Sequence, residues 1–144
     1  MSTVTNVAIR VRVKRVLLSI LAISAADVGG WATVAPRSFY NSFPGGGHHW
    51  ITGDGPYNEH LVRDVGGLYL ALLVVSVWAY LRPELSRLAG ASWLIFSLPH
   101  LAYHLQHLDM FSSADKAGLA VSLGGTVLIA ATLLLAPDRT EANR

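Results

Sequence analysis

Long apolar stretches alternate with short polar connections along this chain. Four of these stretches approach 20 residues, which is about the length that crosses the hydrocarbon core of a bilayer as an α-helix. They cover residues 16–34, 62–81, 88–108 and 117–136. We therefore predict an all-α integral membrane protein, a four-helix bundle preceded by a basic arm at 1–15 and followed by a tail at 137–144.

The composition agrees with a membrane protein. Hydrophobic residues make up 52% of the 144 residues, and charged residues make up 14%. A typical soluble domain has about 25% charged residues. Cysteine is absent, which excludes disulfides, thiolate catalysis and cysteine-ligated metal centres. Any metal site must therefore use His, Asp, Glu or the backbone.

The first apolar stretch has a second interpretation, a cleaved signal peptide. A run of basic residues precedes it, and the sequence Ser-Ala-Ala at 24–26 could be a cleavage site. Apolar residues continue past this point to Val34, so we favour an uncleaved span.

Basic residues flank the predicted spans unevenly, and this bias predicts the orientation. Most lie in the arm, in the connection between the second and third spans and in the tail: Arg10, Arg12, Lys14, Arg15, Arg82, Arg87, Arg139 and Arg144. Loops rich in Lys and Arg stay on the cytoplasmic side. We therefore predict a plasma-membrane protein with both termini in the cytoplasm. These residues do not cluster on a folded domain, so we expect the lipid bilayer and no nucleic acid as a partner.

The third apolar stretch contains three histidines, in the segment LPHLAYHLQHLDMF at 98–111. Each residue of an α-helix turns about 100°, so His100, His104 and His107 fall on one face. In the predicted orientation this face lies in the outer half of the span.

Other ionisable residues are expected at a similar depth. At the start of the second span, the spacing i, i+4 pairs Glu59 with Arg63 and His60 with Asp64. The first span carries a lone carboxylate, Asp27. Ionisable groups in a bilayer are costly and usually mark ligand sites, pathways or relays. We therefore predict an outward-facing polar pocket between the first three spans.

The glycine-rich connection between the first two spans faces the same side and could fold back over the helix ends. It contains His48, His49 and Asp54. We interpret the two adjacent histidines as ordinary exposed loop residues, because such a loop constrains their geometry little.

Imidazole and carboxylate side chains together suit zinc, copper or iron. We predict metal ligands among His100, His104, His107, His60 and Asp64, with Asp27, Glu59 and Arg63 in supporting or relay positions. A haem held by two imidazoles from the second and third spans is the other form of this hypothesis, and either group could have a redox role. The chain has no HExxH motif, which argues against a zincin protease.

Two alternative hypotheses need no metal. The sequence assigns no catalytic residue under these or under the metal hypothesis. The same side chains could form a proton relay or line a small-molecule cavity, since histidine titrates near neutral pH. The chain could also be an accessory subunit of a membrane complex or a homo-oligomer, because pairs of small residues favour close packing of helices in lipid.

Two segments, GPYNEHLVRDVGGLYLAL at 55–72 and LPHLAYHLQHLD at 98–109, resemble the signature segments of small four-helix membrane proteins of actinobacterial type, in the broad DoxX-like grouping. The resemblance runs from Ala22 to about Leu135. It implies a four-helix bundle with both ends in the cytoplasm, and it implies no activity and no ligand set.

Overall fold

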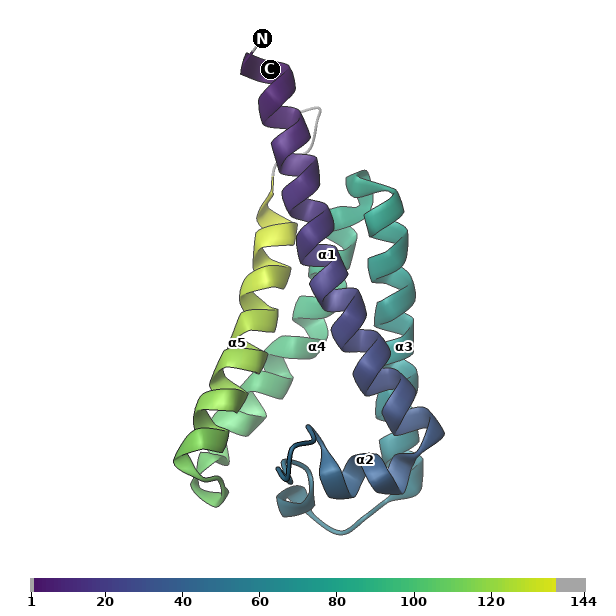
Figure 1. The fold of residues 1–144 in the computed structure, drawn as a ribbon, viewed down its shortest axis with the longest axis vertical. Coiled ribbons are helices and arrows are strands. Elements are labelled where there is room, and N and C mark those ends of the chain that lie inside the picture. The colour runs from purple at the N-terminus through teal and green to yellow at the C-terminus, as the bar shows by residue number, and fades with distance from the viewer. Residues whose placement is uncertain (1, 137–144) are drawn as a thin grey trace.

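The computed structural model of this chain describes residues 2–136, so the tail at 137–144 lies outside the described residues. The described residues form helices and no strand, which confirms the all-α class. The α-helices are α1 (Ser2–Val34), α2 (Pro36–Ser42), α3 (Glu59–Leu81), α4 (Ser86–Gln106) and α5 (Ser113–Leu135), as Figure 1 shows. Three short 3₁₀ helices lie between them: η1 (Thr52–Asp54), η2 (Pro83–Leu85) and η3 (Leu108–Met110).

Three of these helices, α1, α3 and α5, are long and apolar enough to cross a membrane. The histidine-bearing helix α4 is of similar length but is not among them, because serines, histidines and an arginine lower its hydropathy. The basic arm predicted at 1–15 is helical from Ser2 and continues directly into the first span.

Local sequence signals explain where the helices begin. The side chain of Asn58 accepts a hydrogen bond from the Leu61 amide at 3.2 Å and caps α3. Ser112 caps α5 in the same way, with its Oγ 3.2 Å from the Asp115 amide nitrogen. Pro36 occupies the first turn of α2, where its missing N–H leaves no helix hydrogen bond unmade.

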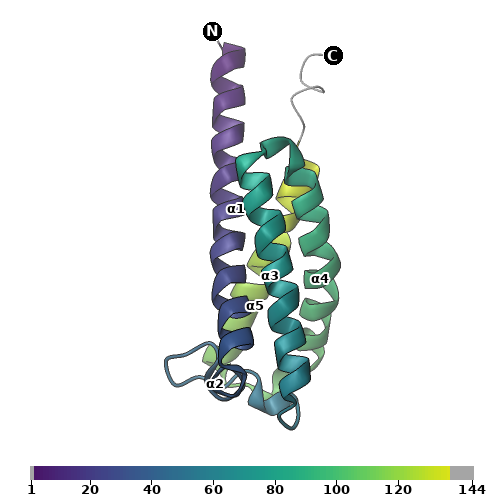
Figure 2. The ribbon, with the colours of Figure 1, turned by 90° about the vertical axis from the view of Figure 1, so that its right-hand side faces the viewer.

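Successive long helices run antiparallel. The start of α1 and the end of α5 lie at the same end of the molecule as η2, which we call the η2 end, and α2 and η1 lie at the other, the α2 end (Figures 1 and 2). Glycines allow two pairs of helices to pack closely. A Cβ on Gly66 of α3 would lie 2.9 Å from the Thr33 nitrogen of α1, and a Cβ on Gly90 of α4 would lie 2.6 Å from the Ala130 oxygen of α5.

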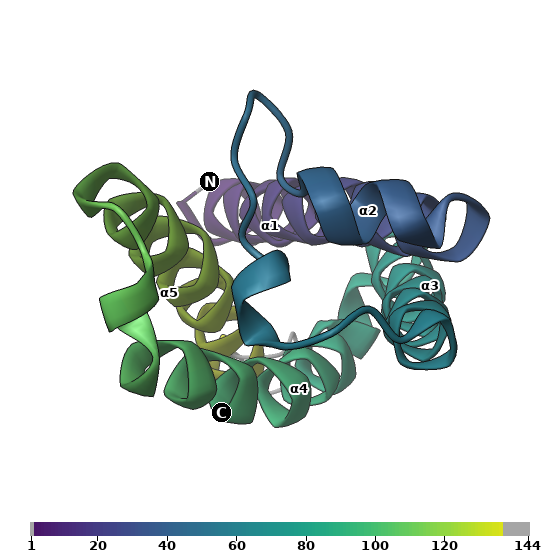
Figure 3. The same cartoon turned by 90° about the horizontal axis from the view of Figure 1, so that it is seen from below.

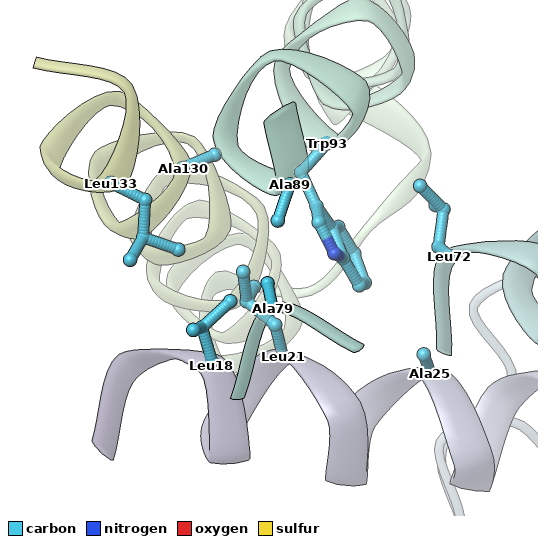
Figure 4. Close-up of a cluster of buried hydrophobic side chains, with 9 residues drawn as sticks. All are labelled: Leu18, Leu21, Ala25, Leu72, Ala79, Ala89, Trp93, Ala130 and Leu133. Carbon is cyan, nitrogen blue, oxygen red and sulfur yellow. The ribbon is translucent and has the colours of Figure 1, made fainter. Parts of the chain in front are cut away.

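All four long helices share a core in the half of the bundle nearer η2. Figure 4 shows its buried side chains: Leu18, Leu21, Ala25, Leu72, Ala79, Ala89, Trp93, Ala130 and Leu133. The indole of Trp93 donates to Ser76 Oγ at 2.8 Å, and this hydroxyl donates to the Leu72 carbonyl at 2.7 Å.

The second buried cluster belongs to one side of the molecule. It contains Val28 and Ala32 of α1, Phe39 of α2 and Val62 of α3, and none of its buried residues comes from α4 or α5. The α1–α3 pair and the α4–α5 pair therefore diverge toward the α2 end (Figure 1).

Candidate functional site

The connection between α2 and α3 bridges the two helix pairs where they diverge. Residues 43–58, which we call the strap, join α2 to α3 and cross the α2 end of the bundle (Figure 3). The indole of Trp50 donates to Asp115 Oδ1 of α5 at 2.8 Å, and His48 Nδ1 lies 2.5 Å from the same oxygen. The ring of Trp50 also packs on Gly118, where a Cβ would lie 2.8 Å from it. The strap therefore holds α5 to the α1–α3 pair.

The strap brings a carboxylate to the end of α4. Gly53 packs against Met110 of η3, since a Cβ there would lie 2.9 Å from the methionine sulfur. Partial burial raises the pKa of the neighbouring Asp54, and the charges of His104 and His107 act to lower it. The carboxyl of Asp54 is thus within electrostatic reach of two of the predicted site residues.

The three histidines around the end of α4 do not all have the same environment, and His107 follows the last residue of the helix. The rings of His100 and His104 are in T-shaped contact, with centroids 4.7 Å apart. His107 is turned onto Tyr103, with ring centroids 4.2 Å apart and its Nδ1 2.8 Å from the Tyr103 carbonyl oxygen. His100 and His104 therefore form a contacting pair, whereas the ring of His107 packs on Tyr103 instead.

Beyond Ser86 at its first turn, α4 carries two more buried side chains with a polar atom that has no partner among the described residues. His104 is 8% exposed and Ser97 is 5% exposed, and seven residues, nearly two turns, separate them. Neither His104 Nδ1 nor Ser97 Oγ has a hydrogen-bond partner among the described residues. A buried polar atom without a partner costs about 1–3 kcal/mol, so these atoms are candidates for binding a ligand.

His100 lies on the edge of an apolar groove between α3 and α4. The groove has a volume of about 440 Å³, and its apolar surface comes from Leu68, Leu72, Ile95, Phe96 and Pro99. Its polar lining residues are His100 and Ser92, and the Ser92 hydroxyl already donates to the Leu88 carbonyl. The ring of His100 stacks on Phe96 at 5.2 Å, and its nitrogens make no hydrogen bond within residues 2–136.

The structure does not bring the other predicted residues to this pair. His60 and Asp64 form an ion pair of 3.3 Å whose side chains are 88% and 60% exposed. Asp27 is also exposed, on the surface of α1. These positions correct the expected pocket, because packing of Gly66 against Thr33 sets the rotation of α3 on α1 and leaves these side chains on the outside.

Glu59 and Arg63 form the predicted i, i+4 pair, with Arg63 Nε 2.9 Å from Glu59 Oε1. Arg63 also donates to the Thr33 carbonyl at the end of α1. Together these contacts join the beginning of α3 to the end of α1. Both residues therefore have structural roles at a distance from the histidine pair.

Within the described part of the chain, no group of three or more His, Asp or Glu side chains is arranged to hold a metal ion. The ligand set of five residues predicted from the sequence is therefore not assembled. The site retains two imidazoles in edge-to-face contact, which can donate or accept hydrogen bonds or bind a metal ion.

Sequence reasoning missed the residues that anchor the strap. His48 was expected to be an ordinary loop residue, and Trp50 and Asp115 were not among the predicted site residues. One signal was present in the sequence: Ser112 and Asp115 match the capping pattern that begins a helix, which places a carboxylate at the first turn of α5.

No known protein-family model, curated protein or solved structure matches this chain. The resemblance to DoxX-like proteins therefore remains a prediction.

Proposed function

We propose that this chain is an integral plasma-membrane protein with four spans, in which α4 crosses the membrane together with α1, α3 and α5. α4 has 21 residues and packs along α5, one of the three apolar helices. The η2 end carries the basic residues Arg10, Arg12, Lys14, Arg15, Arg82 and Arg87, which supports a cytoplasmic position for this end. The strap and the histidine pair then face the outside.

We propose that the function of this protein is to bind a lipophilic small molecule with a carbonyl or hydroxyl head group. The observation that carries this proposal is the imidazole of His100, which has no hydrogen-bond partner at the edge of an apolar groove. An unpaired polar group beside lipid is costly, and the head group of a ligand would satisfy it. The apolar groove would hold the rest of the ligand, and quinones are redox-active compounds of this shape.

His104 extends the proposed site inward. Its ring contacts that of His100, and the strap holds Asp54 close enough for the two charges to interact. Two imidazoles and a carboxylate in sequence can hold or move a proton between the head group of a ligand and the α2 end. This arrangement suits a ligand that gains or loses a proton when it is reduced or oxidised.

Quenching of tryptophan fluorescence by a short-chain ubiquinone and by menadione tests the proposal. We expect His100→Phe, which keeps a ring but loses both nitrogens, to weaken binding about tenfold or more. The matched control is His60→Phe, on the exposed side of α3, which should bind as the native protein does. Equal affinity in the two variants, or no quenching in either, contradicts the proposal.

A second candidate is a metal ion or haem, and one observation favours it. His100 and His104 lie on consecutive turns with their rings in contact, which lets two imidazoles reach one metal, and Asp54 is near. Elemental analysis and an absorption spectrum of the same preparation separate the candidates. A Soret band, or stoichiometric metal that is lost in His104→Leu, would favour this candidate over the lipophilic ligand.

A further inference from the structure

The η2 end of the molecule, opposite the histidines, carries a pocket with different chemistry. α1 has 33 residues and is therefore about 50 Å long, whereas the hydrocarbon core of a bilayer is about 30 Å thick. Figure 2 shows the first turns of α1 projecting beyond the other helices at this end. When α1 spans a membrane, its basic residues lie at the depth of the lipid head groups.

One face of α1 and a tyrosine of α3 form this pocket, which has a volume of about 480 Å³. Arg12, Arg15 and Ser19 line it at spacings of three and four residues, which places them on one side of the helix. The guanidinium carbon of Arg15 lies 5.6 Å from the ring centroid of Tyr80, and this cation–π contact orients the side chain. Tyr80 is next to the last residue of α3, where aromatic side chains mark a membrane interface.

The pocket is electropositive. No carboxylate lines it, and neither Arg12 nor Arg15 forms an ion pair with an acidic side chain within residues 2–136. Val11 and Val16 provide apolar surface beside the two guanidinium groups. The pocket thus combines two cations, a hydroxyl and an apolar side at the depth where a phospholipid changes from head group to acyl chain.

We propose that this pocket binds a phosphate group, presented by the head group of an anionic phospholipid. Guanidinium groups bind phosphate oxygens in a bidentate geometry, and basic pockets on the cytoplasmic side of transmembrane helices bind such head groups. Ser19 can donate a further hydrogen bond, and the valines would contact the glycerol and the first methylene groups. The inference rests on membrane insertion as proposed above and is independent of any ligand at His100.

Native mass spectrometry of the detergent-solubilised protein, titrated with phosphatidylglycerol and with phosphatidylcholine, tests the proposal. We expect Arg12→Gln/Arg15→Gln to weaken retention of phosphatidylglycerol about tenfold or more. The matched control, Arg10→Gln/Arg82→Gln, removes the same charge from the same end of the molecule but from outside the pocket. The affinity of the control should change less than about twofold.

Further variants separate pocket geometry from net charge. Arg12→Lys/Arg15→Lys keeps the charge but loses the bidentate geometry, so we expect an affinity between those of the native protein and the glutamine variant. An equal loss in the pocket and control variants, or a loss in neither, overturns the proposal. Equal binding of soluble glycerol 3-phosphate would retain the phosphate site but overturn the lipid as its source. His100→Phe should retain phosphatidylglycerol as the native protein does, which keeps this test distinct from the test of the histidine site.

Discussion

The two halves of this bundle are held together by different contacts. In the half nearer η2, small and aliphatic side chains of all four long helices form one core, and the polar groups of Trp93 and Ser76 satisfy each other. In the half nearer α2, the helix pairs diverge, and the polar and aromatic contacts of the strap bridge them. Of the four buried side-chain atoms without partners in the described residues, those of Thr33, Ser97 and His104 lie in this half, and that of Ser86 lies at the η2 end.

This difference separates a half whose packing needs no ligand from a half whose buried polar atoms have no partner in the described residues. A core of close-packed apolar groups is stable without any ligand. Buried polar atoms without partners lower stability, and they persist where function needs them. The η2 half should therefore tolerate little change in volume, whereas some substitutions in the α2 half should increase stability.

The largest effect is expected at the close contact of α4 with α5. A Cβ on Gly90 would lie 2.6 Å from two backbone atoms of α5, so Gly90→Ala must push the helices apart. Overpacking of this kind costs about 1–3 kcal/mol. Thermal unfolding in detergent, followed by circular dichroism, measures the loss. The control is Gly124→Ala in α5, where the added methyl meets nothing within 4 Å and stability should be unchanged or slightly higher. Equal melting temperatures for both variants would contradict the role of this contact.

A local effect is expected when the strap loses its anchor. Trp50→Ala removes the hydrogen bond to Asp115 and the packing on Gly118, so the strap should open more often. A loss of about 1.4 kcal/mol raises amide exchange tenfold, and we expect at least this increase across residues 43–58. The core helices should exchange as before. Trp78→Ala, on the exposed side of α3, serves as the control and should leave strap exchange unaltered. Unaltered strap exchange in Trp50→Ala would show that the anchor does not hold it.

Replacing two buried serines, one with and one without a hydrogen-bond partner, should change the free energy of unfolding in opposite directions. Ser76→Ala breaks the buried hydrogen bond from Trp93 and should lower the free energy of unfolding by about 1–2 kcal/mol. Ser97→Ala removes a buried hydroxyl without a partner and should raise it by up to about 1 kcal/mol. Denaturation of both variants in the same detergent measures the difference. A loss of stability in Ser97→Ala would mean that the Ser97 hydroxyl already makes a hydrogen bond in the folded protein and is not free to bind a ligand.

The helices and the histidine pair could be predicted from the sequence, because they depend on local properties. Apolar length places α3, α4, α5 and the end of α1 to within a few residues, and a turn of about 100° per residue places His100 and His104 on one face. The basic arm was not recognised as helical, since its charge hides its continuity with the span.

Rotation of one helix on another could not be predicted, because it depends on contacts between distant residues. The burial of Gly66 against Thr33 turns His60 and Asp64 outward. Nothing in the sequence around either residue predicts that these two residues pack together. The strap likewise depends on a hydrogen bond between residues 65 apart, Trp50 and Asp115. The sequence places His100 and His104 on one helix face, where their rings are in contact, but it also grouped them with His107, His60 and Asp64, which the structure does not bring to them.

The smallest effect is expected at the exposed pair of α3, where the sequence had predicted metal ligands. His60 and Asp64 are mostly exposed, and an exposed ion pair at i, i+4 contributes about 0.3–0.5 kcal/mol. His60→Ala/Asp64→Asn should therefore leave unfolding, strap exchange and quinone quenching nearly as they are in the native protein. His100→Ala/His104→Ala, which also removes titratable groups of the predicted set, should abolish quenching. If the α3 variant instead lost binding, the ligand would have to lie on the outer side of α3, and the comparison between the two halves would need a different explanation.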